Sequence, residues 1–501
     1  MINTPSVDWF AISTILVLLG ASFIALLGAV LVPERARRTF ATAVSVLGFV
    51  GGLITSVWLY VESADGHRVV SDAFYRDRWT ALSQVILCGI GLATSLVATE
   101  QVALPHDEHI AEFFSLLLAS AAGMAFFVGS ANLMVMFLAL EWFSIALYVL
   151  CAIEYDVEGS LEAGLKYLVI GSFGSAALLF GSALTYGATG HLGFAEIAAT
   201  VGTQGLAHDA MLVLGLAMII AGLAFKSSSA PFHMWTPDVY EGAPTTVTAF
   251  MASATKVAAF ALAFRVLQTA FPQELYLWGW AFAGIAVASL AIGNLAALVQ
   301  RNVKRMLAYS SISHAGFLLI GLSAGSALGG RAVMYYLVVY AAMAFGSFAV
   351  VAARERELGV PVTLENLSGF GWERPFLGVA MWFFLFGFAG LPLGGGFVAK
   401  FYVLSAAYQN GWTWLVIVGV IATLVSLYYY LAVVRSMYMR PSEELRIAPV
   451  TGVAPVAGGA PAREPLLHIA VGLALAVSVG SLFVVEPLID LAEHAAASLP
   501  F

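Results

Sequence analysis

Residues 216–232 read LAMIIAGLAFKSSSAPF, an apolar run in which Lys226 is followed within two turns by Pro231. Proline lacks a backbone N–H, and its ring clashes with the carbonyl of the preceding turn. A helix through this stretch is therefore expected to break near Pro231. The stretch predicts a discontinuous helix that carries a lysine beside its break.

The composition of the chain places this break inside a membrane. The 501 residues are 61% hydrophobic and only 10% charged, with a mean hydropathy of +0.91. Soluble domains carry about 25% charged residues, so the chain is predicted to be an integral membrane protein. Non-helical backbone at membrane depth is tolerated only where it is buried in protein or lines a wet cavity.

A second stretch repeats the pattern of the first. Residues 386–404 read FGFAGLPLGGGFVAKFYVL, in which Pro392, Gly394 and Gly395 come shortly before Lys400. Paired segments interrupted by Gly and Pro, in corresponding positions of two halves, indicate an ion pathway between inverted repeats. The sequence therefore predicts a second discontinuous helix with its own lysine.

The whole chain is predicted to be an all-α polytopic protein, with residues 1–501 forming a single membrane domain. A helix needs about 20 apolar residues to cross the hydrocarbon core, and this length gives fourteen candidate spans. They are 9–32, 39–61, 79–98, 111–129, 131–153, 160–187, 209–229, 243–268, 276–299, 303–323, 331–353, 377–406, 412–438 and 466–488. The breaks fall in spans seven and twelve, which predicts two five-helix repeats of opposite topology, spans 4–8 and spans 9–13.

These spans divide the chain into an N-terminal group of three helices, two repeats, a connector and a last helix. The divisions are 1–110, 111–268, 276–438, 439–465 and 466–501. The connector contains VTGVAPVAGGAPAREP, and this composition is typical of a flexible loop.

Apart from Arg265, seventeen lysines and arginines lie in the loops or in the first or last turn of a span, and they divide unevenly between the two sides. Thirteen fall on one side: Arg35, Arg37, Arg38, Arg301, Lys304, Arg305, Arg354, Arg356, Arg374, Arg435, Arg440, Arg446 and Arg463. Four fall on the other: Arg68, Arg76, Arg78 and Arg331. The positive-inside rule puts the larger group in the cytoplasm, so both termini are predicted on the outer side.

Four of the five lysines in the chain lie within predicted spans. An ionisable residue near the bilayer centre costs about 3 kcal/mol or more and is a functional-site hypothesis by default. Lys256 and Lys400 lie deep in their spans and Lys226 lies at a helix break, whereas Lys166 is near the start of span six and could snorkel. A buried lysine can take up and release protons, so the pattern predicts a protein that moves protons or cations.

Four further ionisable residues lie in or beside these spans. Glu141, in FLALEWFSIALYVL, is either a structural ion-pair partner for a buried lysine or a carboxylate that tunes its protonation. His314 is either a satisfied core histidine or a relay group, and His233 is either a cap or a group on the route of proton uptake. Arg265, near the outer end of span eight, is interpreted as interfacial.

The sequence indicates no bound cofactor. Cys88 and Cys151 both lie in apolar runs, so neither a disulfide nor a metal site is predicted. There is no Gly-rich nucleotide loop and no haem motif. Energy for ion movement is therefore expected from another subunit or from an ion gradient.

Two long strings resemble a known family. They are GLAFKSSSAPFHMWTPDVYEGAPTTVTAFMASATK at 222–256 and GNLAALVQRNVKRMLAYSSISHAGF at 293–317. Over residues 110–440 the chain resembles the antiporter-like membrane subunits of respiratory complex I. Among these it is most similar to the subunit N type of bacterial NADH-quinone oxidoreductase.

The resemblance implies roles for five charged residues, each by its own motif. Glu141 in LEWFS matches the glutamate of helix five, and Lys166 in GLKYLVIGS matches the lysine of helix six. Lys226 in AFKSSSAPFH and Lys256 in SATK match the lysines of helices seven and eight. Lys400 in GFVAKFY matches the helix-twelve lysine of subunit N, where subunit M typically has glutamate. The PLGGG at the second break is richer in glycine than the family pattern.

The resemblance implies a proton-pumping membrane arm with fourteen helices and two inverted repeats, in the inner membrane of a bacterium. NADH, FMN, iron-sulfur clusters and quinone are then expected in other subunits, and the partners are neighbouring membrane-arm subunits and lipids, not nucleic acid. Protons are expected to charge Lys226 beside Glu141 and to pass through Lys256, with His314, to Lys400. The alternatives are a subunit of a multisubunit sodium/proton antiporter and a purely structural scaffold, which has no need of four intramembrane lysines.

Overall fold

The computed structural model describes residues 7–101, 109–439 and 464–499. Within these ranges the chain is helical apart from one antiparallel hairpin, β1 (His67–Val69) with β2 (Phe74–Arg76). Eleven helices are long and apolar enough to cross a membrane, or twelve if the bent pair α19 (Pro465–Gly480) and α20 (Val485–Ala496) is one span. An all-helical, multi-pass membrane protein is therefore confirmed.

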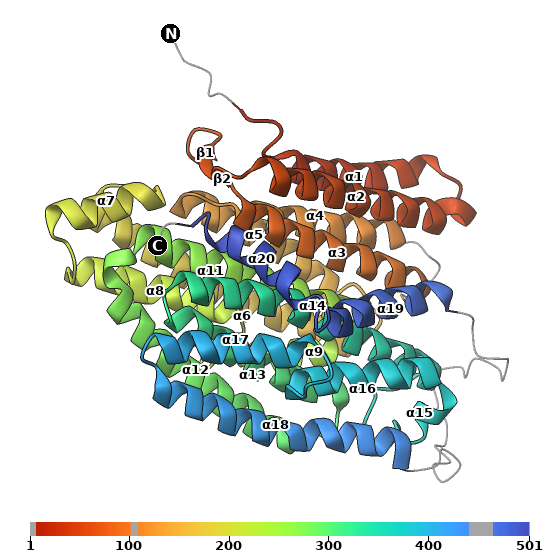
Figure 1. Ribbon diagram of the computed structural model, residues 1–501. Coiled ribbons are helices and arrows are strands. Elements are labelled where there is room, and N and C mark those ends of the chain that lie inside the picture. Colours follow the sequence, from red (N-terminus) through yellow and green to blue (C-terminus); the bar gives the residue numbers. More distant parts are fainter. Residues whose placement is uncertain (1–6, 102–108, 440–463, 500–501) are drawn as a thin grey trace.

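The N-terminal helices form one edge of the molecule. They are α1 (Ser13–Leu31), α2 (Glu34–Glu62) and α3 (Arg78–Gln101). Helices α1 and α2 lie along the edge opposite to α18 (Thr413–Met439) in Figure 1. Large apolar side chains such as Leu31, at 86% exposure, point outward from this edge, as expected for helices that face lipid.

The next helices build the first half of the bundle. They are α4 (Ile110–Val128), α5 (Leu133–Cys151), α6 (Glu158–Thr189), α7 (Phe194–Gln204), α8 (Ala210–Lys226), α9 (Trp235–Gly242), α10 (Thr245–Phe250) and α11 (Lys256–Ala270). Asn132 separates α4 from α5, because its side chain accepts a hydrogen bond from the Val135 amide and caps α5. Gly205, at φ 65°, ends α7 in the left-handed conformation that glycine favours.

The remaining helices complete the bundle. After a 3₁₀ turn at Pro272–Glu274 come α12 (Leu275–Leu298), α13 (Val303–Ser323), α14 (Ala327–Leu358), α15 (Phe370–Glu373), α16 (Pro375–Ala389), α17 (Gly395–Gln409) and α18. The segment from α10 to α11 is buried along its whole length, and α13 and α14 are buried along most of theirs. These three spans form the centre of the bundle.

Two apolar helices end close to the predicted breaks. Helix α8 ends at Lys226 and α9 begins at Trp235, so the segment that contains Pro231 is not α-helical. Helix α16 ends at Ala389, and α17 begins only at Gly395. Both breaks fall where a proline removes the amide that would continue the helix.

The span predicted over 466–488 is not one continuous helix. Helix α19 ends at Gly480, and α20 leaves it at an angle of 90°. The physical reason is Pro487, which a helix tolerates only in its first turn, so a new helix starts at Val485. Helix α20 packs against α14 and α3 through one face that includes Ile489 and Ala492.

Candidate functional site

The first break is stabilised by one of the predicted lysines. In a continuous helix the carbonyl of Ser227 would accept from the amide four residues on, but that residue is Pro231, which has no N–H. Instead Nζ of Lys256 donates to the Ser227 carbonyl at 3.0 Å. A π-helical turn, Met251–Thr255, lies immediately before Lys256, and such turns are frequent at functional sites.

Lys226, the last residue of α8, reaches polar groups on α5 and α6. Its Nζ donates to Ser144 Oγ at 2.8 Å and to the Tyr167 hydroxyl at 3.1 Å. The ammonium also stands 4.3 Å from the ring centroid of Phe143, a distance at which the face of the ring attracts a cation. The lysine is held by hydroxyls and an aromatic face.

Glu141 lies one turn before Ser144 on α5 and is half-buried. Its Oε1 is buried and has no hydrogen-bond partner among the described residues. Within the described ranges no ion pair joins Glu141 to Lys226 at 4 Å or less. The Lys226 ammonium, from α8, therefore contacts α5 at Ser144, one turn after Glu141, and not at Glu141 itself.

Lys400, on α17, turns back toward the second break. Its ammonium stands 4.4 Å from the ring centroid of Phe317 on α13. Its side chain passes Gly390, the left-handed cap of α16 at φ 76°, so closely that a Cβ there would meet Lys400 Cδ at 2.9 Å. The two ends of the break also pack tightly against each other. A Cβ on Gly396 would lie only 2.1 Å from the Gly387 carbonyl oxygen.

A histidine and two tyrosines lie between these lysines. Nδ1 of His314 is 2.6 Å from the Tyr336 hydroxyl, and Nε2 is 3.2 Å from the Tyr430 hydroxyl. The Tyr430 hydroxyl also contacts Ser310 Oγ at 2.5 Å. The imidazole packs 4.8 Å from the ring of Phe388, one turn before the second break. His314 is thus a fully hydrogen-bonded core residue that stands in a chain of exchangeable protons.

Sequence reasoning missed these tyrosines. Tyr340 continues the row, because its hydroxyl donates to Ser311 Oγ at 3.0 Å. Tyr336 and Tyr340 are four residues apart on α14 and face α13, so their spacing was a usable signal. A buried tyrosine normally finds a partner for its hydroxyl; here the Tyr336 and Tyr430 hydroxyls meet at His314, and Tyr340 joins them through its ring, 5.3 Å from the imidazole.

The three deep lysines share an unusual environment. Lys226, Lys256 and Lys400 are 3%, 0% and 5% exposed. Over the described ranges, none of them has a carboxylate within 4 Å. A buried charge without a partner is costly, and an amine can relieve that cost by releasing its proton. Chemically, the arrangement suits groups that alternate between charged and neutral forms.

Lys166 has a different environment. Its side chain is 38% exposed and forms ion pairs with Glu162 at 2.7 Å and Asp238 at 3.0 Å. Arg305 binds Asp238 at 2.7 Å and Glu241 at 2.8 Å, so α9 is tied to both α6 and α13. These charges line a pocket of about 260 Å³. Water therefore reaches Lys166.

His233 and Arg265 also differ from the deep lysines. His233 is half-buried after the break, its carbonyl accepts from the Thr236 amide at 2.9 Å, and its Nδ1 is buried without a partner in the described part of the chain. Arg265, interpreted from the sequence as interfacial, is buried inside the protein. It is 0% exposed and binds both carboxylate oxygens of Asp77, at 2.6 and 2.8 Å, because Asp77 folds inward at the start of α3.

Another lysine was mistaken for a loop residue. Lys304 is 6% exposed, and its Nζ donates to the Ala243 carbonyl at 3.3 Å and to Thr245 Oγ1 at 3.0 Å. Glu355 lies 3.3 Å from the same ammonium and also accepts from Thr245. Unlike the deep lysines, Lys304 is therefore paired with a carboxylate.

Among the described residues, no group of three or more His, Cys, Asp or Glu could hold a metal ion. Cys88 and Cys151 are free and buried in separate helices, α3 and α5. The chemistry of the site is that of amines, hydroxyls, an imidazole and a carboxylate.

Comparison with known proteins agrees with this geometry. Residues 130–426 match the family model described as "NADH:quinone oxidoreductase/Mrp antiporter, TM". The chain belongs to this family. The matched residues include both breaks and the three deep lysines, so the resemblance inferred from the sequence is confirmed.

Relatives named NADH-quinone oxidoreductase subunit N match most of the chain. The protein of Trichlorobacter lovleyi is 40% identical over 417 residues, which cover 83% of this chain and 84% of that protein. The protein of Methylobacterium nodulans is 37% identical over 498 residues, covering 98% and 97%.

Solved structures give the same fold. A chain of respiratory complex I from Thermus thermophilus, solved with bound aureothin, aligns with a TM-score of 0.78 at 30% identity, covering 96% of this chain and 99% of that one. A chain of the Mrp complex from Dietzia sp. has a TM-score of 0.83 at 22% identity, covering 98% and 97%. The second likeness shows the fold alone.

Proposed function

We propose that this chain is a proton-translocating membrane-arm subunit of NADH-quinone oxidoreductase, coupled to NADH oxidation and quinone reduction in other subunits. The observation that carries the proposal is the set of three buried lysines without a carboxylate partner in the described structure, two of them at helix breaks. A scaffold gains nothing from such charges, because unpaired buried ions destabilise a fold. The subunit N relatives supply the redox context.

The proton route begins at Lys226 and ends at Lys400. Lys256 binds the carbonyl of Ser227, the residue next to Lys226, so both amines lie at the first break, and the proposed transfer between them requires a bridging water. From Lys256 the proton passes along the hydroxyls and imidazole of the row around His314. Lys400, over Phe317, receives it at the second break.

Glu141 controls the start of this route. One helical turn separates it from Ser144, which holds the Lys226 ammonium. When Glu141 is ionised it favours the charged lysine, and a change that moves or neutralises the carboxylate favours proton release. Lys166 and His233 lie on the water-accessible approach to Lys226 and help to deliver protons.

The topology proposed for this function has fourteen crossings. Counting α8 with α9, α16 with α17 and α19 with α20 as one crossing each adds three to the eleven long helices. Spans 4–8 and 9–13 are then inverted repeats, each with one break. Both termini face the periplasm, on the strength of the basic residues that the positive-inside rule assigns to the cytoplasm.

The test is proton transport by the native complex that contains this chain. The complex would be purified, reconstituted into liposomes and given NADH and a quinone, while a pH-sensitive dye reports the lumen. Proton movement that requires both substrates supports the proposal. If the chain purifies without redox subunits and exchanges sodium for protons instead, the antiporter alternative is correct and the proposal is wrong.

A further inference from the structure

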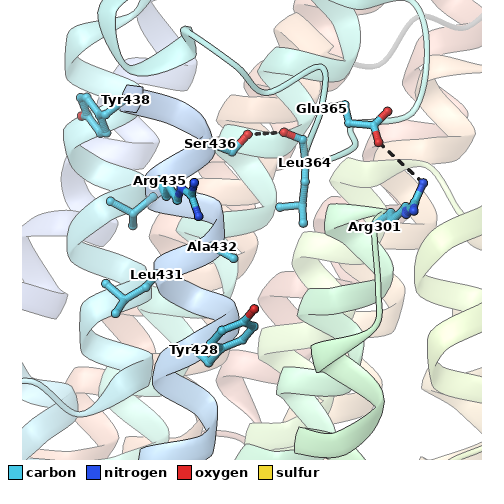
Figure 2. A pocket seen from close by; sticks show the side chains of 10 residues that line it. Arg301, Leu364, Glu365, Tyr428, Leu431, Ala432, Arg435, Ser436 and Tyr438 are labelled. Atoms are coloured by element: carbon cyan, nitrogen blue, oxygen red, sulfur yellow. Dashed lines mark hydrogen bonds and ion pairs between the residues drawn. The ribbon is translucent and has the colours of Figure 1, made fainter. Parts of the chain in front are cut away.

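A pocket of about 680 Å³ lies where α13 begins and α18 ends, and none of the three deep lysines lines it. Arg301 and Arg435 stand on opposite sides of it, with Glu365 on the side of Arg301 (Figure 2). We propose that this pocket binds an anionic phospholipid, with its phosphate between the two arginines and an acyl chain along α18. The proposal is independent of proton transport.

The outer face of α18 supplies the apolar part of the site. Leu424, Tyr428 and Leu431 are 67%, 69% and 41% exposed. They follow one another at intervals of three and four residues, and Arg435 continues the series, so all four share one face of the helix. Along this face the apolar stretch of Leu424, Tyr428 and Leu431 is followed by Arg435, and a bilayer likewise passes from an apolar core to a charged headgroup region.

The two arginines supply the charge. Arg435 makes no hydrogen bond or ion pair with another described residue, and Figure 2 shows it on the wall of the pocket. Arg301 pairs with Glu365 at 3.7 Å, with side chains 85% and 65% exposed. Exposed pairs of this kind contribute little, so a phosphate can compete for the guanidinium. Guanidinium groups bind phosphate oxygens through two parallel donors.

The pocket is preformed by a contact between α18 and the segment before α15. The Ser436 hydroxyl donates to the carbonyl of Leu364, as drawn in Figure 2. This bond fixes the wall that carries Leu364 and Glu365 against α18. A ligand therefore meets a ready cavity that opens both to the apolar face and to the basic end of the bundle. Basic pockets between membrane helices at the cytoplasmic side suit anionic headgroups.

The occupant is a lipid because both chemistries occur in one site. A free phosphate would use the arginines but leave Leu424 and Leu431 uncovered. A zwitterionic lipid would cover the apolar face but gain less from two arginines and one carboxylate. Phosphatidylglycerol and cardiolipin satisfy both requirements.

The experiment uses the full-length chain purified with its associated subunits, partly delipidated and placed in nanodiscs of phosphatidylcholine. Photoactivatable phosphatidylglycerol, or phosphatidylcholine with identical acyl chains, is titrated in, and labelled peptides are identified by mass spectrometry. We expect saturable labelling of Thr413–Met439 by phosphatidylglycerol at lower concentrations than by phosphatidylcholine. Excess inorganic phosphate should not abolish it.

Charge-removing variants give the magnitude. Arg435→Gln and Arg301→Gln should each weaken phosphatidylglycerol labelling about fivefold, and together about 25-fold. Arg435→Lys should retain most of the labelling, which separates lost charge from a damaged fold. Arg35→Gln is the matched control, because it removes one exposed arginine from the same predicted side, on α2.

Three results would overturn the proposal. One is equal labelling by the two lipids with no effect of the double variant. Another is labelling abolished by inorganic phosphate, which would make the pocket a phosphate site. The third is a crosslink from this face to a neighbouring subunit in the intact complex, which would make it a protein interface.

Discussion

Replacing Lys256 by methionine isolates the titratable amine at the first break. Lys256 is fully buried, and its Nζ satisfies the Ser227 carbonyl that Pro231 leaves without an amide. Methionine keeps a long apolar side chain but removes the charge and the donor. We expect the variant to assemble normally and to lose proton transport.

The structure indicates why stability should change little. An unsatisfied buried Ser227 carbonyl costs about 1–3 kcal/mol. Removing an ammonium that has no carboxylate within 4 Å in the described structure relieves a penalty of several kcal/mol. These effects oppose each other, so the net change should be within about 2 kcal/mol of zero. Transport should fall at least about tenfold, equivalent to about 1.4 kcal/mol in barrier height.

The assay compares protons moved per NADH oxidised in liposomes that contain the intact complex. Lys256→Arg should not rescue transport, because guanidinium keeps its proton. Lys166→Met is the matched control, since this lysine is 38% exposed and water can partly replace it, so its loss should be smaller. If Lys256→Met and Lys256→Arg both pump at the native ratio, proton release from this side chain is not part of the mechanism.

The remaining predictions concern the carboxylate, the buried ion pair and the topology. Glu141→Gln should lower protons moved per NADH at least about threefold, a barrier change of about 0.7 kcal/mol, and Glu141→Asp should be milder; unchanged pumping by Glu141→Gln would contradict its control of Lys226. Asp77→Asn leaves the Arg265 charge unpaired, so denaturant unfolding should show a loss of about 3–5 kcal/mol. The paired change Asp77→Leu with Arg265→Met should cost clearly less, and equal losses would argue against an electrostatic cause. Reporter fusions after Phe501 should place the C-terminus in the periplasm, and a cytoplasmic signal would overturn the proposed span count.

The general architecture could be predicted because its signals are local. Each apolar run is visible as composition, and each break coincides with a proline that cannot donate a hydrogen bond. The same rule applies to Pro487, which argues against a continuous helix over 466–488. There the hydropathy of the run outweighed the proline in the prediction, and the prediction failed.

Contacts between distant segments could not be predicted in the same way. Asp77 follows the hairpin between two spans, and nothing in its neighbourhood points to Arg265, 188 residues later. Lys304 looked solvated because it sits among basic residues, yet the end of α9 covers it. Lys256 was predicted to be functional, but its contact with the Ser227 carbonyl depends on the packing of α11 against the break.

The hydroxyl groups that contact Lys226 explain why this lysine can pass a proton on instead of holding it permanently. The Ser144 and Tyr167 hydroxyls that hold Lys226 can each donate or accept a hydrogen bond. They can therefore solvate the ammonium as acceptors and the neutral amine as donors, so neither form is trapped. A carboxylate in direct contact would stabilise only the charged form, as Glu355 does for Lys304. Placing Glu141 one turn away from the contact leaves it able to bias Lys226 without locking it.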